Sequence, residues 1–290
     1  MATTQPIKDR MKALKAEYDK LRQGKESLLT IIDESELSES VFNSNAIENS
    51  TLTLKETEQI LLDLEVSRNV SVREVFEAKN LARVMEYIKG KLGEKELSED
   101  MVLFLHKMLI GNINDGIAGR FRQTGEYVRV GNHIAPAPEH VQRMIDKILL
   151  SYTSDHETYF ADKIATFHLD FETIHPFCDG NGRIGRVIIN IQLQKLGFPN
   201  IIIRDKEKQD YYESFRIYNH SKKTTLMEKI VTLALIESLH KRITYLRGQS
   251  IITLADFSRT QKRSLHTLSN AARRQTIPAF RERGEWKIGT

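Results

Sequence analysis

The chain has 290 residues, of which 40% are hydrophobic and 28% are charged, and its formal net charge at pH 7 is +4. This is the composition of an ordinary soluble protein, and the length allows one large domain with a small second domain. No apolar run approaches the roughly 20 residues of a membrane-spanning helix, and the single cysteine, Cys178, excludes an intramolecular disulfide bond.

The N-terminal part of the chain is predicted to be helical. Residues 7–34 place apolar side chains at helical spacing, for core packing or for contact with a second copy of the chain. The start of the chain is charged throughout and lacks the apolar core of a signal peptide. Together with the single cysteine, this absence predicts a cytoplasmic protein, because thiols stay reduced in that compartment.

A polar stretch, SESVFNSNAIENSTL, follows this helix. Ser44 and Glu48 are four residues apart, so a helix would place both on one face. From the residues alone, the stretch is a surface helix that ends near Asn49. Three scaffold helices come next, each with apolar residues at helical spacing, at residues 57–64, 72–92 and 101–110.

Between residues 115 and 138 the pattern changes. The segment is rich in glycine, and its residues alternate in polarity at 127–130, which favours a short β-hairpin. Two more helices are expected at residues 141–152 and 160–174. The second of them leads directly into the segment that carries most of the candidate chemistry.

The twelve residues from His175 to Arg186 read HPFCDGNGRIGR. An apolar run, residues 187–196, follows them and predicts a helix that the glycine-rich turn opens. Helix N-termini and successive backbone N–H groups bind anions, and glycine lets the backbone approach a phosphate closely. Because Arg183 and Arg186 lie about one helical turn apart, the segment is suited to a polyphosphate.

Two other side chains of this segment indicate chemistry. Ionised Asp179 has only acceptor oxygens, which suit a hard cation such as Mg2+ that bridges phosphate groups. His175 is the one group of the segment that could take up a proton near neutral pH. A purely structural turn would need the glycines, but not the histidine, the carboxylate and both arginines. Cys178 is expected to have a packing role.

The C-terminal part changes character near residue 246. Before it, a long apolar helix at residues 226–246 closes the domain. After it, residues 246–290 contain nine basic and three acidic residues, whereas the rest of the chain has a slight excess of acidic residues. Two units with different partners are therefore predicted. The helix that precedes residue 226 carries an aromatic stripe of Tyr211, Tyr212, Phe215 and Tyr218.

The segment from His175 to Arg186 resembles the motif of the Fic family, HPFx(D/E)GNGRxxR, and agrees with it at every specified position. The resemblance implies a mostly α-helical fold, with an N-terminal helical region over residues 1–95 and a Fic core with a β-hairpin flap over residues 96–245. It also implies a protein adenylyltransferase, which transfers AMP from ATP to a Ser, Thr or Tyr hydroxyl of a target protein. Related Doc-type kinases usually carry lysine where this chain has Gly182, so the glycine favours AMP transfer over phosphorylation.

The resemblance also implies individual roles. His175 would be the base that deprotonates the target hydroxyl, and Asp179 would hold Mg2+ on the α- and β-phosphates of ATP. Arg186 would bind the γ-phosphate, and a tyrosine of the aromatic stripe would line the base pocket. The residues expected to bind ATP are Gly180, Asn181, Gly182, Arg183, Arg186, Tyr211 and Tyr212.

The segment from Ser44 to Asn49 matches the pattern (S/T)xxxE(G/N) of the inhibitory helix that many Fic proteins carry, expected here at about residues 38–50. By this resemblance, Glu48 would pair with Arg186 and occupy the place of the γ-phosphate, so that ATP could bind only in an unproductive pose. Carboxylate–guanidinium pairing gives such a contact a physical basis.

The predicted hairpin resembles the flap of the Fic family, which begins with a G-x-x-R element that residues 119–122 match. The flap would add a strand to the target segment through its backbone and hold the target hydroxyl near His175. Strand addition recognises the main chain, so it does not identify the target. The flap residues expected to dock the target are Val128, Arg129, Val130, Gly131, Asn132 and His133.

The tail at residues 246–290 resembles the small winged helix-turn-helix modules of the excisionase and MerR type. It is expected to contain helices at residues 253–257 and 264–274, and a strand-like end, GEWKI. Ser264 and Thr267 lie where a recognition helix presents its base-contacting side chains. A basic cap that docks on the rest of the chain or on an acidic partner remains the alternative. The residues that would face DNA phosphates are Arg273, Arg274, Arg281 and Arg283.

Two functions of different classes remain open on the sequence. The first is an autoinhibited adenylyltransferase, which could also remove AMP with Glu48 orienting a water molecule. The second is a DNA-binding regulator in which ATP at the Fic site is a sensed ligand. Intact His175 favours the first, because a pure binding site needs no base. The expected cofactor is Mg2+, with ATP as co-substrate. The expected partners are a target protein, DNA through residues 246–290 and a second copy of the chain, without a membrane.

Overall fold

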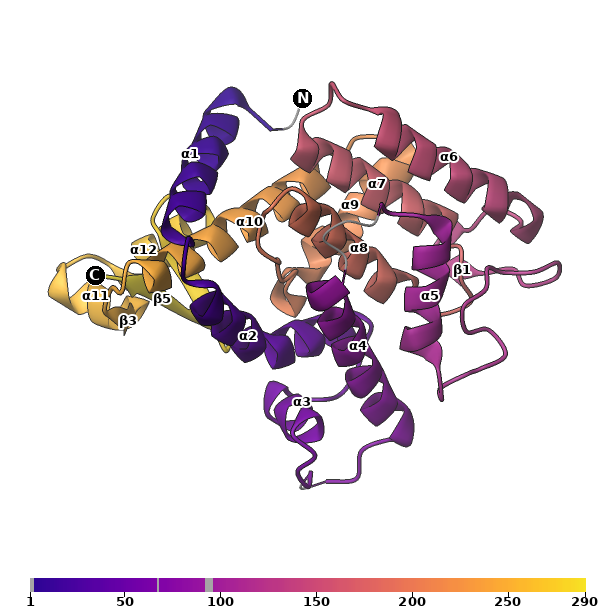
Figure 1. The fold of residues 1–290 in the computed structure, drawn as a ribbon, viewed down its shortest axis with the longest axis horizontal. Coiled ribbons are helices and arrows are strands. Elements are labelled where there is room, and N and C mark those ends of the chain that lie inside the picture. The colour runs from indigo at the N-terminus through magenta and orange to yellow at the C-terminus, as the bar shows by residue number, and fades with distance from the viewer. Residues whose placement is uncertain (1–2, 67, 92–95) are drawn as a thin grey trace.

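Helices form most of the chain in the computed structural model, which describes residues 3–66, 68–91 and 96–290 (Figure 1). The larger part comprises α1 (Gln5–Leu21), α2 (Glu26–Ile47), α3 (Leu54–Leu61), α4 (Val72–Lys91), α5 (Glu99–Ile110), β1 (Arg129–Val130), β2 (His133–Ile134), η1 (Pro138–His140), α6 (Val141–Ser154), α7 (Phe160–Ile174), α8 (Asn181–Lys195), η2 (Asp205–Glu207), α9 (Lys208–Ser221) and α10 (Thr225–Leu246). The C-terminal part comprises β3 (Ile251–Thr253), α11 (Leu254–Thr260), α12 (Leu265–Arg273), β4 (Ala279–Glu282) and β5 (Glu285–Gly289). None of the described helices is long and apolar enough to cross a membrane.

The expectation of one helix over residues 7–34 is wrong, because the chain turns at Gly24. Gly24 has a φ of +70°, a left-handed conformation that glycine adopts readily and other residues adopt rarely. The second helix, α2, then continues to Ile47. The segment expected as an inhibitory helix at residues 38–50 is therefore the C-terminal part of a longer helix, and Glu48 is its C-cap residue.

The apolar face of α1 packs inside the molecule. Met11 and Tyr18 are buried in a core that α1 shares with α7, α8, α9 and α10. The expected core packing of this helix is therefore present, and the contact with a second copy stays a prediction.

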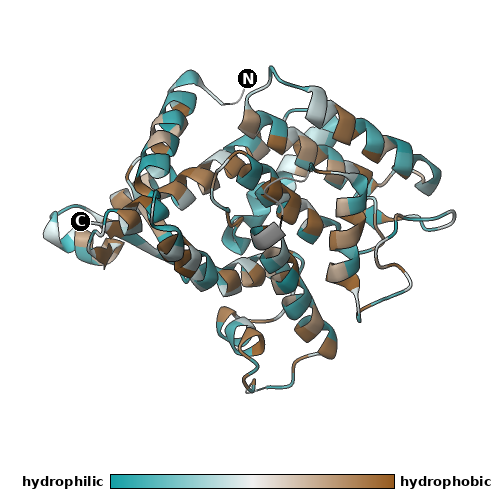
Figure 2. Cartoon of the chain, in the orientation of Figure 1, coloured by the Kyte–Doolittle hydropathy of each residue, from teal (hydrophilic) through white to brown (hydrophobic). Residues whose placement is uncertain are grey.

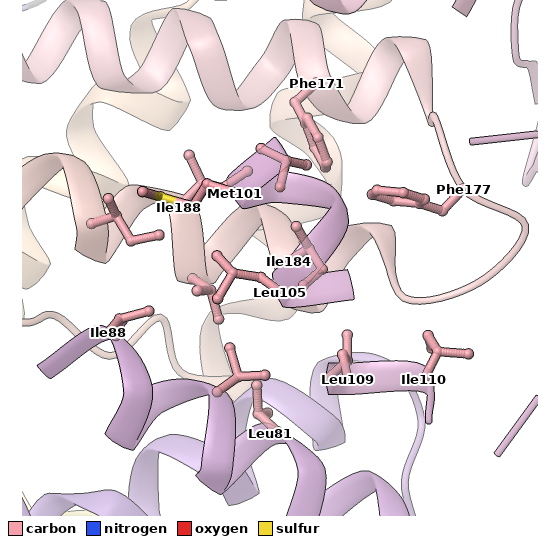
Figure 3. Packing of buried hydrophobic residues seen from close by; sticks show 14 of the residues in the cluster. Leu81, Ile88, Met101, Leu105, Leu109, Ile110, Phe171, Phe177, Ile184 and Ile188 are labelled. Carbon is pink, nitrogen blue, oxygen red and sulfur yellow. The ribbon is translucent and has the colours of Figure 1, made fainter. Parts of the chain in front are cut away.

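Helix α8, which the glycine-rich turn opens, lies between two apolar cores. Ile184 and Ile188 pack with residues of α4, α5 and α7 (Figure 3). Ile189 and Leu193 belong to the second core, with α1, α7 and α10. Figure 2 shows that apolar residues concentrate on the central helices. Because α8 packs into both cores, the turn before it is anchored in the interior of the molecule.

The remaining predicted elements lie close to their expected positions. Helices α3, α4 and α5 correspond to the scaffold helices, and residue 92, the expected end of the second one, lies outside the described residues. The β-hairpin is present, with Arg129 paired to Ile134 and Val130 paired to His133. It is held near the end of α7 by contacts described below.

The C-terminal residues form a small module with its own core. Its strands lie in the order β3-β5-β4, with antiparallel neighbours, and β4 packs against α10. The two predicted helices and the strand-like end are present as α11, α12 and β5, whereas the sequence did not predict β3 and β4. The core of the module is formed by Leu254, Leu268, Ala272, Ala279 and Ile288.

Candidate active site

His175 terminates α7 in a left-handed backbone conformation. It is the C-cap residue with a φ of 50°, and its backbone N–H donates to the carbonyl oxygen of Phe171 at 2.9 Å. This conformation is uncommon for a residue other than glycine and requires support from its surroundings. Arg122 provides it: the buried guanidinium donates from Nε to the carbonyl oxygen of His175 at 2.8 Å and from Nη2 to that of Ile174 at 3.2 Å.

The same arginine joins the flap to this site. Arg122 Nη2 donates to the carbonyl oxygen of Pro136 at 2.8 Å, just beyond β2. Flap residue His133 also contacts α7, with Nε2 2.8 Å from the carbonyl oxygen of Thr173. The sequence identified Arg122 only as part of the G-x-x-R element and did not indicate that it would anchor both the flap and the end of α7.

The turn between His175 and α8 is shaped by Asn181 and Gly180. The Asn181 side chain accepts from the N–H of Phe177 at 2.9 Å and donates to its carbonyl oxygen at 2.8 Å. Gly180 has a φ of +83°, and a Cβ there would stand 3.1 Å from Ile110 and Leu109. The polar atoms of the Asn181 side chain, expected among the ATP ligands, are thus used within the turn. The backbone N–H groups at the start of α8 are the groups of this turn that are suited to an anion.

Asp179 lies on the outer side of this turn and is paired with two arginines. Arg183 Nη2 is 2.9 Å from Asp179 Oδ1, and Arg73 contacts the other carboxylate oxygen. Burial alone would raise the pKa of Asp179, but the charges of Arg183 and Arg73 outweigh it and lower the pKa. Asp179 is therefore ionised at neutral pH. One ionised carboxylate fits Mg2+, which proteins usually bind through one or two carboxylates together with substrate phosphates.

The expected pairing of Glu48 with Arg186 is present. Arg186 Nη2 lies 2.9 Å from Glu48 Oε1. Arg186 Nε donates to Ser44 Oγ at 3.0 Å, and Nη2 donates to the carbonyl oxygen of Ser44 at 2.8 Å. These three residues, Ser44, Glu48 and Arg186, are called the Glu48 clamp below. The carboxylate also lies directly over Gly182, in the first turn of α8.

The two tyrosines expected at a base pocket have different environments. Tyr211 is 1% exposed and lies behind Arg186, which donates from Nη1 to the tyrosine hydroxyl at 3.3 Å. Its hydroxyl is also 2.8 Å from His168 Nε2. Tyr211 therefore supports Arg186 and does not line an open pocket, which corrects its expected role. Tyr212 is 39% exposed, and its hydroxyl donates to the carbonyl oxygen of Ile47 at 2.7 Å, at the end of α2.

A second carboxyl group, which the sequence did not single out, lies beside His175. Glu172 Oε2 is 3.7 Å from His175 Nδ1, and both side chains are nearly buried. Burial and the charge of Glu48 raise the pKa of Glu172 to about 8, while burial lowers the pKa of His175 to about 4. At neutral pH, the resting site thus contains a protonated glutamic acid next to a neutral histidine. The spacing of three residues on a helix is the signal that could have identified the pair.

The C-terminal arginines do not form one surface. Arg281 Nη2 lies 2.6 Å from Glu237 Oε2, and Nη1 lies 2.8 Å from Glu207 Oε1, so the expectation that Arg281 faces DNA is wrong. Arg283 contacts Glu58 at 2.5 Å. Arg273 and Arg274 are exposed and form no ion pair with any described residue.

Comparisons with known proteins agree with this geometry. Residues 96–193 match the family model described as Fic/DOC family. A stretch of 187 residues is 34% identical to the protein adenylyltransferase Fic of Nematostella vectensis, covering 62% of this chain and 43% of that protein. The chain spans less than half the length of the first curated relatives that it matches.

Solved structures share the fold. A Fic domain containing signaling protein from Bacteroides thetaiotaomicron superposes with a TM-score of 0.74 at 24% identity, over 83% of this chain and 97% of that chain. A Fic family protein from Desulfovibrio desulfuricans superposes with a TM-score of 0.65 at 19% identity, over 99% of this chain and 97% of that chain. The predicted, mostly α-helical Fic-type fold is therefore confirmed, and the second likeness extends through the C-terminal module.

Proposed function

We propose that the chain is a protein adenylyltransferase that transfers AMP from ATP to a Ser, Thr or Tyr hydroxyl of a target protein, and that the structure is its inhibited form. The observation that carries this proposal is the position of the Glu48 carboxylate. It lies on Arg186 and over the first turn of α8, so an anionic group already occupies part of an anion-binding helix start. The adenylyltransferase relative from Nematostella vectensis supports the same activity.

The residues of the site suit this reaction. The target hydroxyl oxygen attacks the α-phosphorus of ATP, the new oxygen–phosphorus bond forms, and the bond to the bridging oxygen breaks to release pyrophosphate. His175 takes up the hydroxyl proton, while the start of α8, Arg183 and Arg186 bind the phosphates. When bound, Mg2+ neutralises phosphate charge, and ionised Asp179 is the residue that would hold it. The chain's own contribution is mainly positioning and charge stabilisation.

The flap is the proposed docking site for the target. Its strands, β1 and β2, are two residues each and largely exposed. They pair only with each other among the described residues, so each keeps a free edge. An extended target segment can add to such an edge through main-chain hydrogen bonds. Because Arg122 ties the flap to the end of α7, a segment docked there would be held close to His175.

The Glu48 clamp is the proposed inhibitory device. Arg186 is 6% exposed and is fully engaged by Ser44, Glu48 and Tyr211. A γ-phosphate can bind this guanidinium only after the carboxylate has left, because both require the same donors. The end of α2 must therefore move, or Glu48 must change rotamer, before ATP can bind productively.

Transfer of label from ATP labelled at the α-phosphate, with Mg2+, tests the proposal in three proteins: the parent, Glu48→Gly and Glu48→Gly with His175→Ala. We expect label on protein to increase by at least about tenfold with Glu48→Gly, equivalent to about 1.4 kcal/mol of inhibition, and to disappear in the double variant. Glu157→Gly is the matched control, because Glu157 is an exposed loop glutamate without an ion pair to a described residue.

The other outcomes distinguish the alternatives. If ATP binds and no variant transfers label, in the pure protein or in a lysate, the nucleotide-sensing regulator replaces the enzyme. If the parent releases AMP from a labelled target and Glu48→Gly does not, the chain also removes AMP with Glu48 orienting a water molecule.

For the C-terminal module, residues 246–290, we propose a winged-helix role in nucleic-acid binding through α12. Leu268 and Ala272 face the core of the module, so the opposite face of the helix points outward. That face is exposed and basic, a composition suited to phosphates and base edges. Its exposed residues are His266, Thr267, Arg273 and Arg274, and Asn270 on the same face is half-buried.

A further inference from the structure

We propose that Glu172 is the positioning residue of His175: its carboxyl group lies on the Nδ1 side of the ring and decides which ring nitrogen carries the proton. When Glu172 is ionised, it accepts from Nδ1–H, and Nε2 is free to act as the base. When Glu172 is protonated, it donates to Nδ1, and Nε2–H cannot accept a proton. The inference rests on the proposed function, because it assigns Nε2 of His175 as the atom that takes up the target's proton.

The geometry places the two groups next to each other in a nearly buried part of the site. Glu172 Oε2 lies 3.7 Å from His175 Nδ1, and the two side chains are 11% and 14% exposed. Neither His175 Nδ1 nor Glu172 Oε1 has a hydrogen-bond partner among the described residues. Buried polar atoms normally find one. A shift of less than about 1 Å would bring the separation into the range of a hydrogen bond.

The backbone of the two helices holds the carboxyl group in this position. Glu172 lies in the last turn of α7, and the left-handed conformation of His175 directs the chain out of the helix immediately afterwards. On the other side, α8 leaves room at Gly185, where a Cβ would stand 2.7 Å from Glu172 Oε1 and 2.7 Å from His168 Cε1. The carboxyl group therefore packs against the α8 backbone and has little freedom to turn toward solvent.

Charged side chains from other elements face both Glu172 and His175. Glu172 faces Glu48 of α2, which raises its pKa, and Arg186 of α8, which lowers it, while burial is the main cause of its pKa of about 8. His175 faces the backbone of Glu172 and the side chains of Glu48, Arg122 and His133, and burial is the main cause of its pKa of about 4. Of the pair, Glu172 is therefore the group that titrates near physiological pH, while His175 stays neutral and changes only its tautomer.

This arrangement predicts an unusual pH dependence. AMP transfer should increase with pH as Glu172 ionises, between its ordinary value of about 4.5 and about 8. Removal of Glu48 moves the increase toward the lower end of that range, because its negative charge no longer opposes ionisation. A glutamine at position 172 cannot titrate and can accept from Nδ1–H at every pH. With this substitution, the rate of AMP transfer should no longer depend on pH above about pH 6.

The first test is the rate of AMP transfer from pH 6 to 9 in Glu48→Gly, with and without Glu172→Gln. We compare the rate with Gln at position 172 to the rate with Glu at that position. Because only the rate with Glu should fall as the pH decreases, the ratio of the first rate to the second should increase, by up to about tenfold per pH unit below the Glu172 pKa. Asp170→Asn is the matched control, because it removes a carboxylate of the same helix that binds Tyr218. If Glu172→Gln lowers the rate by the same factor at every pH, its role is structural and the inference is wrong.

The second test does not depend on activity. In the parent chain with 15N-labelled histidine, the His175 nitrogen signals, assigned by comparison with His175→Ala, report which ring nitrogen carries the proton. We expect the proton to pass from Nε2 to Nδ1 as the pH increases through about 8, and this change to be absent in Glu172→Gln. If no protein transfers AMP but the tautomer changes as expected, the proposed function fails and the inference about Glu172 stands. If the tautomer does not change with pH, the inference fails whatever the activity.

Discussion

The carboxylate of Glu48 occupies the space that a side chain at Gly182 would fill: a Cβ at Gly182 would stand 2.1 Å from Glu48 Oε1. The same Cβ would lie 3.1 Å from Arg186 Nη1. The glycine was expected from the family resemblance to favour AMP transfer over phosphorylation. The structure adds a second requirement, since the Glu48–Arg186 pair also needs position 182 to lack a side chain.

We expect Gly182→Ala to affect stability differently with and without Glu48. In the parent chain, the new methyl group forces Glu48 to move, which should lower the free energy of unfolding by about 1–3 kcal/mol. In Glu48→Ala, the same change should be neutral or stabilise by up to about 1 kcal/mol, because alanine favours a helix over glycine. Urea unfolding of the four proteins measures the coupling. Additive effects would mean that the two side chains do not compete for this space.

Glu39 joins α2 to the C-terminal module, and its removal should be strongly destabilising. Its buried carboxylate contacts Arg204 and accepts from the backbone N–H groups of Arg283 at 3.1 Å and Gly284 at 3.0 Å. Glu39→Ala leaves a buried arginine charge without this partner, a change that typically costs 3–5 kcal/mol. Glu58→Ala, which removes the contact of the exposed Arg283 side chain, should cost at most about 1 kcal/mol. Equal effects on urea unfolding would contradict this ranking.

Arg281 should behave as a structural residue. It is nearly buried between Glu237 and Glu207, and its guanidinium lies 4.6 Å from the centre of the Trp286 ring. Arg281→Ala should lower the free energy of unfolding by about 3–5 kcal/mol, because Glu237 loses a buried partner. A thermal or urea unfolding curve that matches the parent would show that the module docks without this contact.

In contrast to Arg281, Arg273 and Arg274 should contribute to DNA binding and little to stability. Replacement of both by alanine should change the free energy of unfolding by less than about 0.5 kcal/mol, as for exposed residues without special contacts. Binding to a fluorescein-labelled DNA duplex, measured by anisotropy at several salt concentrations, should weaken, and the salt slope should decrease by about 1 for each lost phosphate contact. Lys262→Ala serves as a comparison at the polar turn before α12. If the parent binds no duplex at low salt, the nucleic-acid proposal is wrong.

His106 should make the fold sensitive to acid. Its Nδ1 accepts from the N–H of Gly119 at 3.0 Å, its Nε2 lies 3.0 Å from the carbonyl oxygen of Asp179, and its ring stacks on Phe177. Burial lowers the pKa of His106 to about 4, below the ordinary value of about 6.5. The unfolded chain therefore binds this proton more readily, so stability is complete above pH 6.5 and is lost as the pH falls toward 4.

Urea unfolding at pH 7.5, 6 and 5 measures this effect. The parent should lose stability across the series, and His106→Gln should lose less of it, although its stability at pH 7.5 is lower. His266→Gln, at an exposed histidine, should keep the parent's pH dependence. An identical loss in His106→Gln and the parent would assign the acid sensitivity to the other buried histidines, such as His168 and His240.

The sequence was most informative where function depends on a short, rigid segment. The turn from His175 to Arg186 is rich in glycine and charged residues, and the apolar run that continues it into α8 is visible in the sequence. Glu48 could be matched to Arg186 only through the family resemblance, since the two lie 138 positions apart and nothing in the sequence between them indicates that they meet. The hairpin was predicted from alternation and glycine content, because both are local properties.

The sequence by itself therefore determined the helical class and the glycine-rich turn, and from that turn it predicted anion binding, a base and the chemistry to which they are suited. Only the tertiary structure decided which of the long charged side chains are paired with one another. In the sequence Arg281 resembles a DNA contact, but in the fold it is paired with Glu237 and Glu207. Glu172 is one of many helical carboxylates in the sequence, but in the fold it lies beside His175, where the chain leaves the helix. The physical reason is that backbone turns and apolar periodicity are specified within a few residues, whereas the pairing and protonation of a buried charge depend on every element packed around it.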